Sequence, residues 1–286
     1  MKRIMISLTL LAFATALIVF SNSAVSSEHV NEKYQCPMKC EGEKMYDNPG
    51  KCPVCGMTLK IIDEPVSNKI QGADYSVKVI GAMMNVMHQG ELFGRINLDT
   101  ISSKKHLFGL GPIEYLKGEV LIKDGKCFVS RVSSNGEITV ENNFKVRAPF
   151  FVYGNVDKWD ETALPDSVQS LTQLNSFLEQ ATGNHSRPFA FRLTADIDSC
   201  EIHIVNLPNG KEVHSPQEAH EGQKSYSLQN ERAELVGFFS TEHQMVFTHH
   251  DTFVHIHLIS SDGKKMGHLD NLMIKKGTAK LYLPAE

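Results

Sequence analysis

The sequence predicts a mainly β protein with a small cysteine-rich unit near its N-terminus. Short runs of apolar, β-branched and aromatic residues recur over residues 75–284, and turn sequences such as Asp124-Gly125 separate them. One segment, residues 167–182, has the apolar spacing of an amphipathic helix. Four of the six cysteines lie within twenty residues, between Cys36 and Cys55, which sets this stretch apart from the strand-rich body.

Residues 1–24 have a positively charged start, an apolar run from 4 to 20 and small residues up to Ala24. These are the parts of a secretory signal peptide, so the sequence predicts cleavage near Ala24 and an exported, periplasmic protein. An uncleaved membrane anchor is the alternative, because the apolar run is almost long enough to span a bilayer. No later segment has the length and apolar character of a membrane span.

The composition excludes one functional class and bounds the size of the core. The net charge is -4, and the 29 lysines and arginines are scattered, which argues against a nucleic-acid-binding protein. About 260 residues remain after signal cleavage, which is enough for one large or two moderate domains.

A flexible leader at 25–33 precedes a compact unit at 34–60, in which two short turns carry the cysteines. The turns have the patterns Cys-Pro-x-x-Cys and Cys-Pro-x-Cys-Gly, which let two thiolates converge on one ion. So short a unit buries little apolar surface, and a bound metal or two disulfides must therefore hold it together. Met38 and Met57 add thioethers, which favour Cu+. The four candidate ligands are Cys36, Cys40, Cys52 and Cys55.

This unit resembles the small heavy-metal-binding domain of copper exporters and efflux adaptors. The two cysteine turns and the Pro49-Gly50 pair before the second turn carry the resemblance. Lys39 and Cys40 stand where the family has His and Pro, so Cys40 is the candidate replacement for the lost His ligand. The resemblance implies that the unit binds Cu+ or Zn2+. A disulfide knuckle without metal is the alternative in an oxidising compartment.

Residues 61–73 form a charged linker, and the predicted body extends from 74 to 286. Residues 77–87 predict a short helix whose methionines lie in the core. Residues 108–112 predict a glycine-rich loop, while 118–130 predict a hairpin that turns at Asp124-Gly125. Further strands are predicted at 144–153, 189–193, 200–205 and 235–239. Cys127 and Cys200 are either buried thiols or a disulfide pair.

The apolar segment at 254–258 contains two histidines at alternate positions. On a strand His255 and His257 point to the same face. The polar residues 260–265 predict a turn, and a hairpin across it brings His268 back beside the pair. Three imidazoles and one open position make a catalytic zinc site. The alternative is a half-exposed strand that carries surface histidines. For His249 and His250 a surface role is predicted, and the alternatives are partners of the metal ligands or an extra metal site.

Taken in order, the segments of the body resemble α-acetolactate decarboxylase, over residues 75–284. The resemblance is carried by the segments 108–111 and 116–119 with the Asp124-Gly125 hairpin, and by 189–192, 235–238, 254–258 and 267–268. Each segment is short, and their shared order and spacing carry the resemblance.

The resemblance implies a two-part β body, with an open sheet and a barrel-like sheet. It implies that His255, His257 and His268 bind Zn2+ and that Glu119 and Arg192 face this metal. The implied reaction is the decarboxylation of 2-acetolactate, a 2-hydroxy-3-keto acid, to acetoin through a metal-stabilised enediolate. Arg192 then holds the substrate carboxylate and Glu119 donates the proton. The alternative for Glu119 is a solvated residue at a strand end, and the alternative for Arg192 is a structural salt bridge.

Two departures leave other functions open. The family has a further C-terminal tail that brings a carboxylate close to the zinc, and only Glu286 is available to replace it. In addition, the activity of the family uses an intracellular precursor, whereas this protein is predicted to be exported. The alternatives are a non-enzymatic copper- or zinc-binding protein on a degenerate scaffold and a related lyase for another 2-hydroxy-3-keto acid. The expected partners are a small-molecule substrate and metal ions. Binding to nucleic acid is not expected, and neither is binding to a membrane after signal cleavage. A homodimer is left open.

Overall fold

The computed structural model describes residues 33–36, 41, 44–54, 58–62, 76–183 and 185–285. The predicted signal peptide, Cys40, Cys55 and Glu286 lie outside these ranges, as do most of the leader and most of the linker. Within these ranges no helix has the length and apolar character needed to cross a membrane.

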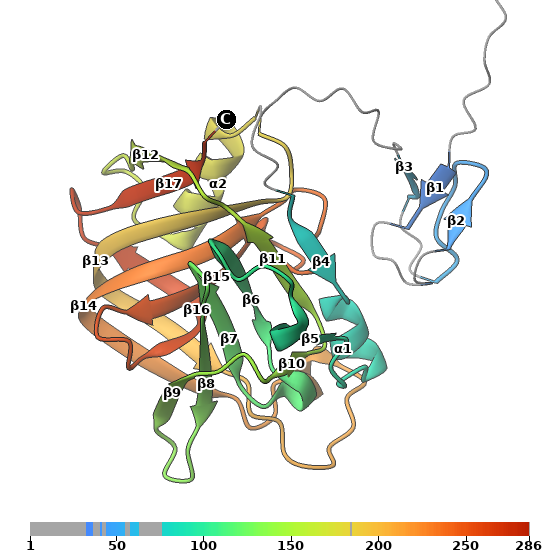
Figure 1. Ribbon diagram of the computed structural model, residues 1–286, viewed down its shortest axis with the longest axis horizontal. Coiled ribbons are helices and arrows are strands. Elements are labelled where there is room, and N and C mark those ends of the chain that lie inside the picture. Colours follow the sequence, from blue (N-terminus) through green and yellow to red (C-terminus); the bar gives the residue numbers. More distant parts are fainter. Residues whose placement is uncertain are drawn as a thin grey trace, which may run out of the picture.

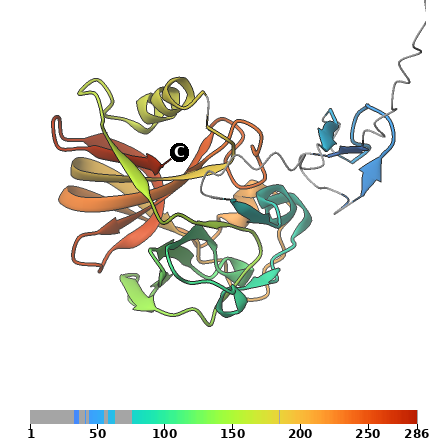
Figure 2. The same ribbon diagram turned by 45° about the horizontal axis from the view of Figure 1, so that its top comes forward.

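The body is mainly β, as the sequence predicts, and it consists of two sheets of six strands each. The open sheet has the order β4 (Lys78–Ile80), β11 (Phe151–Asn155), β6 (Leu107–Pro112), β7 (Glu119–Lys123), β8 (Lys126–Val132) and β9 (Ile138–Asn142). The second sheet has the order β12 (Trp159–Ala163), β17 (Lys280–Pro284), β13 (Phe189–Ile204), β14 (Lys224–Phe239), β15 (Val254–Ser260) and β16 (Met266–Ile274). Figures 1 and 2 show the second sheet packed over the open sheet.

The second sheet closes on itself, because β16 pairs with β13 as well as with β15. β13 is long enough to serve both neighbours: its first half pairs with β17 and its second half with β16. The ring β13–β14–β15–β16 therefore has the barrel-like form that the family resemblance implies. The predicted strands 189–193 and 200–205 are one continuous strand, since the polar residues between them alternate outward while Ala195 and Ile197 point into the core.

Alternation along the ring strands separates two cores. The inward side chains of β13 and β15, such as Phe191, Leu193 and Leu258, fill the interior of the ring. The side chains on the other face, such as Ala190 and Ile259, pack with Phe108 and Leu121 of the open sheet. Alternate residues of β15 and of the start of β13 therefore lie in the layer between the two sheets.

Three predicted elements differ in the structure. The helix expected at 77–87 is divided into β4 and α1 (Met83–Gln89), because Gly81 has a φ of +66° and lies against the carbonyl of Pro149. The expected loop at 108–112 is strand β6, where the absence of a side chain at Gly109 makes room for the Phe151 ring. The strand expected at 144–153 is divided into β10 (Arg147–Ala148) and β11.

The remaining elements are short. The predicted helix at 167–182 is α2 (Leu171–Ala181), which begins at a capping box formed by Ser170 and Gln173. The hairpin of β7 and β8 turns at Asp124 and Gly125, both with positive φ, as predicted. The other elements are α3 (Pro216–Ala219), the 3-10 turns at Leu98–Thr100 and Glu114–Leu116, and β5 (Ile96–Asn97), which pairs with β10.

The cysteine-rich unit contains a three-stranded sheet in the order β2 (Met45–Tyr46), β1 (Lys33–Gln35) and β3 (Lys60–Ile62). Cys36 and Cys52 are buried in its core. In the body, Cys127 and Cys200 are separate buried thiols. Burial raises the pKa of Cys127 to about 12 and that of Cys200 to about 11, so both thiols stay protonated at neutral pH.

Replacing Gly237 with alanine tests the packing of the ring. Gly237 pairs with Phe191 and Ile256, and a Cβ atom there would lie 2.3 Å from the fully buried Phe191 ring. We expect Gly237→Ala to lower the free energy of unfolding by about 1–3 kcal/mol, measured by urea denaturation. Gly183→Ala, which meets no atom within 4 Å, is the control. Equal stability of the two variants would contradict the packing described.

Candidate metal centre

Strands β15 and β16 bring the three predicted histidines together. Along β15, Val254, Ile256 and Leu258 point into the ring, so His255 and His257 point toward the open sheet. The turn at residues 260–265 is held by Ser260, whose Oγ accepts a hydrogen bond of 3.0 Å from the Lys265 amide. This turn sets a register in which His257 lies directly opposite His268.

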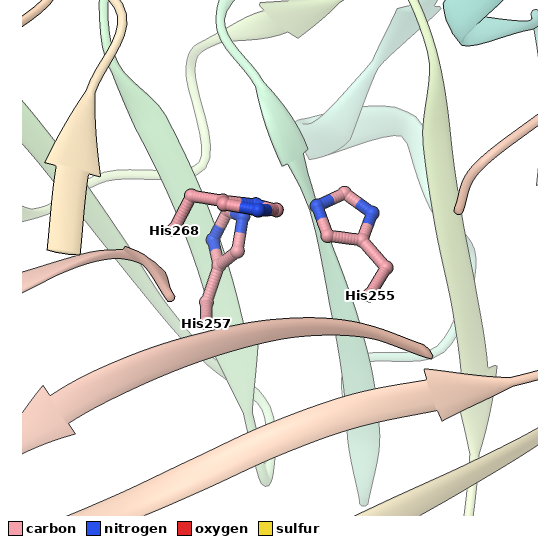
Figure 3. Close-up of side chains that lie close together, drawn as sticks. All are labelled: His255, His257 and His268. Atoms are coloured by element: carbon pink, nitrogen blue, oxygen red, sulfur yellow. The ribbon is translucent and has the colours of Figure 1, made fainter. Parts of the chain in front are cut away.

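The three imidazoles form a compact group in the layer between the sheets. Their ring centroids are 4.9 Å apart for His255 and His268, 5.1 Å for His255 and His257, and 5.5 Å for His257 and His268. One potential ligand atom from each residue lies within 4.8 Å of the others. Figure 3 shows the rings of His257 and His268 side by side and that of His255 turned toward them. The alternative of a half-exposed strand with surface histidines is excluded, because all residues of β15 are buried.

Burial controls the charge of these histidines. Loss of hydration lowers the pKa of His257 to about 3, and it lowers the pKa values of His255 and His268 well below the ordinary range. All three imidazoles are therefore neutral at pH 7, and each keeps a lone pair for a metal ion. Nδ1 of His255 and both ring nitrogens of His257 are buried and have no hydrogen bond of normal geometry within the described ranges.

These observations fit a bound Zn2+. Neutral imidazole nitrogens are preferred zinc ligands, and three of them leave a fourth position for water or substrate. Buried nitrogens without a partner are rare in folded proteins, and a metal ion would satisfy them.

Glu119 reaches the same place from the open sheet. It is the first residue of β7 and is only 3% exposed, so it is not a solvated strand end. Its Oε2 lies 3.6 Å from Nε2 of His257, and its Oε1 accepts a hydrogen bond of 3.4 Å from the Val205 amide. Burial raises the pKa of Glu119 to about 7, against an opposing influence of His203. At neutral pH this carboxyl group therefore holds a proton for a large part of the time.

Arg192 has other partners. Its Nε and Nη2 donate to Oε1 of Glu234 at 2.8 and 2.7 Å, and its guanidinium carbon lies 5.5 Å from the centre of the Trp159 ring and 5.1 Å from that of Tyr282. The register nevertheless puts Arg192 in one row with His257, two strands away across Val236. The structure thus brings Glu119 against the histidines and leaves Arg192 in an ion pair at the same level of the sheet.

Further polar residues surround the group, and of these the sequence did not single out His203 and Asp270. His203 of β13 pairs with His268, and the two ring centroids are 4.6 Å apart. Nδ1 of His203 lies 2.7 and 2.8 Å from the two carboxylate oxygens of Asp270. Nε2 of His249 lies 3.4 Å from Nε2 of His268, so His249 is not a surface residue as expected, whereas His250 is exposed.

The available space lies on two sides of the histidines. A cavity of about 20 Å³, the space of one water molecule, is lined by His255 and His268 on one side and by Met83, Met87 and Phe150. A larger cleft of about 280 Å³ begins where the pairing of β15 with β16 ends, beyond His257 and His268. It is lined by His268, Asp270 and residues of α2. A small molecule therefore has room beside His268 on the side of the cleft.

Comparisons with known proteins agree with this architecture. The profile of the family described as Alpha-acetolactate decarboxylase matches residues 76–284, and the profile described as Heavy metal binding domain matches residues 33–62. The chain is 24% identical to the α-acetolactate decarboxylase of Methanosarcina mazei over 217 residues, which covers 76% of this chain and 71% of that protein.

Solved structures share the fold. The α-acetolactate decarboxylase of Bacillus subtilis strain 168 aligns with a TM-score of 0.58 at 19% identity, over 73% of this chain and 86% of that one. A Staphylococcus aureus protein of unknown function, similar to α-acetolactate decarboxylase, aligns with a TM-score of 0.58 at 14% identity, over 72% and 84% of the two chains. The profile match spans more than two thirds of the sequence, and the chain therefore belongs to the α-acetolactate decarboxylase family, with a heavy-metal-binding domain at its N-terminus.

Proposed function

We propose that the body is a zinc-dependent enzyme that decarboxylates 2-acetolactate to acetoin. The observation that carries the proposal is the group of three neutral, buried imidazoles with the Glu119 carboxyl 3.6 Å from His257, in a chain of this family. Imidazoles for a metal ion and a carboxyl that can carry a proton are the two components that this reaction requires.

The residues have separate tasks in the proposed reaction. Zinc held by His255, His257 and His268 would act as a Lewis acid toward the carbonyl oxygen of the substrate. Decarboxylation breaks the bond between the carboxylate and the hydroxyl-bearing carbon, and the electron pair of that bond passes toward the adjacent carbonyl. A proton must then reach this carbon. Glu119, with a pKa of about 7, can deliver it and take another from solvent before the next turnover.

Arg192 is proposed to hold the carboxylate of the substrate. One strand, β14, lies between Arg192 and His257, which corresponds to about 10 Å between their backbones, and the long side chain of Arg192 can cover much of this distance. The guanidinium is paired with Glu234, so this role requires the ion pair to open when the substrate arrives.

Metal handling without catalysis is the second candidate function. It is favoured by the match to a heavy-metal-binding domain and by the buried cysteines Cys36 and Cys52. We also propose that the protein is exported, on the basis of the charged start and apolar run of residues 1–24.

Acetoin formation from racemic acetolactate by the zinc-loaded protein is the direct test. We expect turnover by the wild type and a loss of about 100-fold or more in His255→Ala, because two imidazoles hold zinc weakly. His250→Ala, an exposed neighbour in the sequence, is the control and should keep full activity. A folded, zinc-bound wild type that produces no acetoin would favour metal handling instead.

The proton-donor role of Glu119 predicts the effect of an amide at this position. We expect Glu119→Gln to lower kcat by about 10²–10⁴-fold, since the amide cannot release a proton, while the zinc content stays the same. The measurements are steady-state kinetics and metal analysis. Glu141→Gln, an exposed carboxylate on β9, is the matched control. Unchanged kcat in Glu119→Gln would assign the proton to another group.

The carboxylate-binding role of Arg192 predicts a change in KM. Lysine retains the charge but loses the planar, two-pronged donor, so we expect Arg192→Lys to raise KM about tenfold with a smaller effect on kcat. Arg232→Lys, at an exposed ion pair with Asp196, should leave both constants unchanged. If Arg192→Lys alters only the thermal stability, Arg192 is a structural residue.

A further inference from the structure

The proposed reaction leaves several metal-binding side chains unused. His203, His220 and His249 surround the three imidazoles, and Asp270 lies two residues after His268 on β16. Three imidazoles suffice for a catalytic zinc site, so the site itself does not require these groups. Burying further imidazoles nearby costs free energy unless they have partners of their own.

His203 and Asp270 form a defined pair at the edge of the group. Nδ1 of His203 lies within 2.8 Å of both oxygens of the Asp270 carboxylate. The His203 side chain is 8% exposed, whereas that of Asp270 is 33% exposed and lines the larger cleft. The pair therefore joins a buried nitrogen donor to a carboxylate that ions in solution can reach.

The distances suit a cation. One atom each from His203, His268 and Asp270 lies within 4.8 Å of the others. Ligand bonds of about 2.0–2.2 Å place two ligand atoms of a tetrahedral ion about 3.4 Å apart, so small side-chain rotations would bring a nitrogen of His203 and an oxygen of Asp270 onto one ion beside His268. A nitrogen and carboxylate donor set is typical of borderline divalent cations such as Zn2+ and Co2+.

This second group shares His268 with the triad. The centre of the His268 ring is 4.6 Å from that of His203 and 4.9 Å from that of His255. A neutral imidazole has a single lone pair, so His268 serves the ion of the triad, and His203 and Asp270 with water hold the second ion beside it. The carboxylate of Asp270 also supplies negative charge, which the three neutral imidazoles lack.

We propose that His203 and Asp270, with His268 beside them, bind a second divalent cation next to the triad of His255, His257 and His268. The body then takes up two cations, one in the triad and one at the mouth of the cleft. This site goes beyond the proposed decarboxylation and does not depend on it, because the argument uses only the positions of the donor atoms.

Metal counting with Co2+ tests the second site. The full-length protein is stripped of metal, loaded with excess Co2+, desalted and analysed for bound cobalt. We expect Asp270→Asn and His203→Gln each to hold one cobalt fewer per chain than the wild type, while the remaining body cobalt is retained. The N-terminal cysteines contribute equally to all samples, so the difference reports on the body. Asp198→Asn, an exposed carboxylate on β13, should keep the wild-type count.

Electron paramagnetic resonance gives an independent readout. Two neighbouring Co2+ ions couple magnetically, so the wild-type signal should be smaller than the sum of two isolated ions. Removing the second ion in Asp270→Asn should restore the signal of an isolated ion, and difference spectra cancel the cobalt of the N-terminal cysteines. If His203→Gln does not fold, as judged by circular dichroism, Asp270→Asn carries the test, since its side chain is one-third exposed.

Two results would overturn the proposal. A wild-type cobalt count in Asp270→Asn would make His203 and Asp270 an ordinary ion pair. Loss of all body cobalt in this variant would mean that the residues serve a single metal site. Neither measurement uses a substrate, so a result that contradicts the second metal site does not contradict the proposed decarboxylation. In the same way, a failure to form acetoin leaves the cobalt count valid.

Discussion

The burial of three imidazoles between two sheets is the constraint on which the rest of the site depends. An unsatisfied polar group in a protein interior costs about 1–3 kcal/mol, and among the described residues both ring nitrogens of His257 and Nδ1 of His255 have no hydrogen bond of normal geometry. The same burial keeps the rings neutral, because a charged imidazolium would lose its hydration. The surrounding apolar core therefore offsets the cost of holding nitrogen lone pairs ready for a metal ion.

The site exists only because the two sheets pack face to face. The closed ring supplies the histidines from β13, β15 and β16, and the open sheet supplies Glu119 from β7. Glu119 would be solvated at the end of an isolated β7, where its pKa would be close to that of a free carboxyl. Contact with the ring removes water from Glu119 and raises its pKa to about 7. Packing of the two layers thus produces both the metal ligands and a proton-carrying carboxyl.

The two parts of the chain suit different metal chemistry. The described cysteines of the N-terminal unit, Cys36 and Cys52, offer soft sulfur donors, which favour Cu+ and Zn2+. The body offers imidazoles and carboxylates, which suit borderline divalent cations. A heavy-metal-binding domain joined to a decarboxylase-family body therefore combines a sulfur donor set, which also suits Cu+, with a nitrogen and oxygen donor set.

The sequence by itself determined the local features of the site. Strict alternation put His255 and His257 on one face, the polar turn at 260–265 returned His268 beside them, and Asp124-Gly125 fixed the hairpin of β7 and β8. The same alternation places Asp270 on the face of His268, a signal that the sequence offered and that the prediction did not use. Family resemblance, rather than local pattern, pointed to Glu119 and to the two-part body.

Only the tertiary structure decided which distant residues meet. His203 lies 65 positions before His268, and the pairing of β13 with β16 that joins them follows from closure of the ring, which no local pattern encodes. Whether Glu119 is solvated or buried depends on the packing of one sheet on the other, and the partner of Arg192 depends on the register of β13 against β14. Local sequence fixes the face on which a side chain lies, because alternation is a property of the backbone, whereas long-range pairing and packing fix what that face meets.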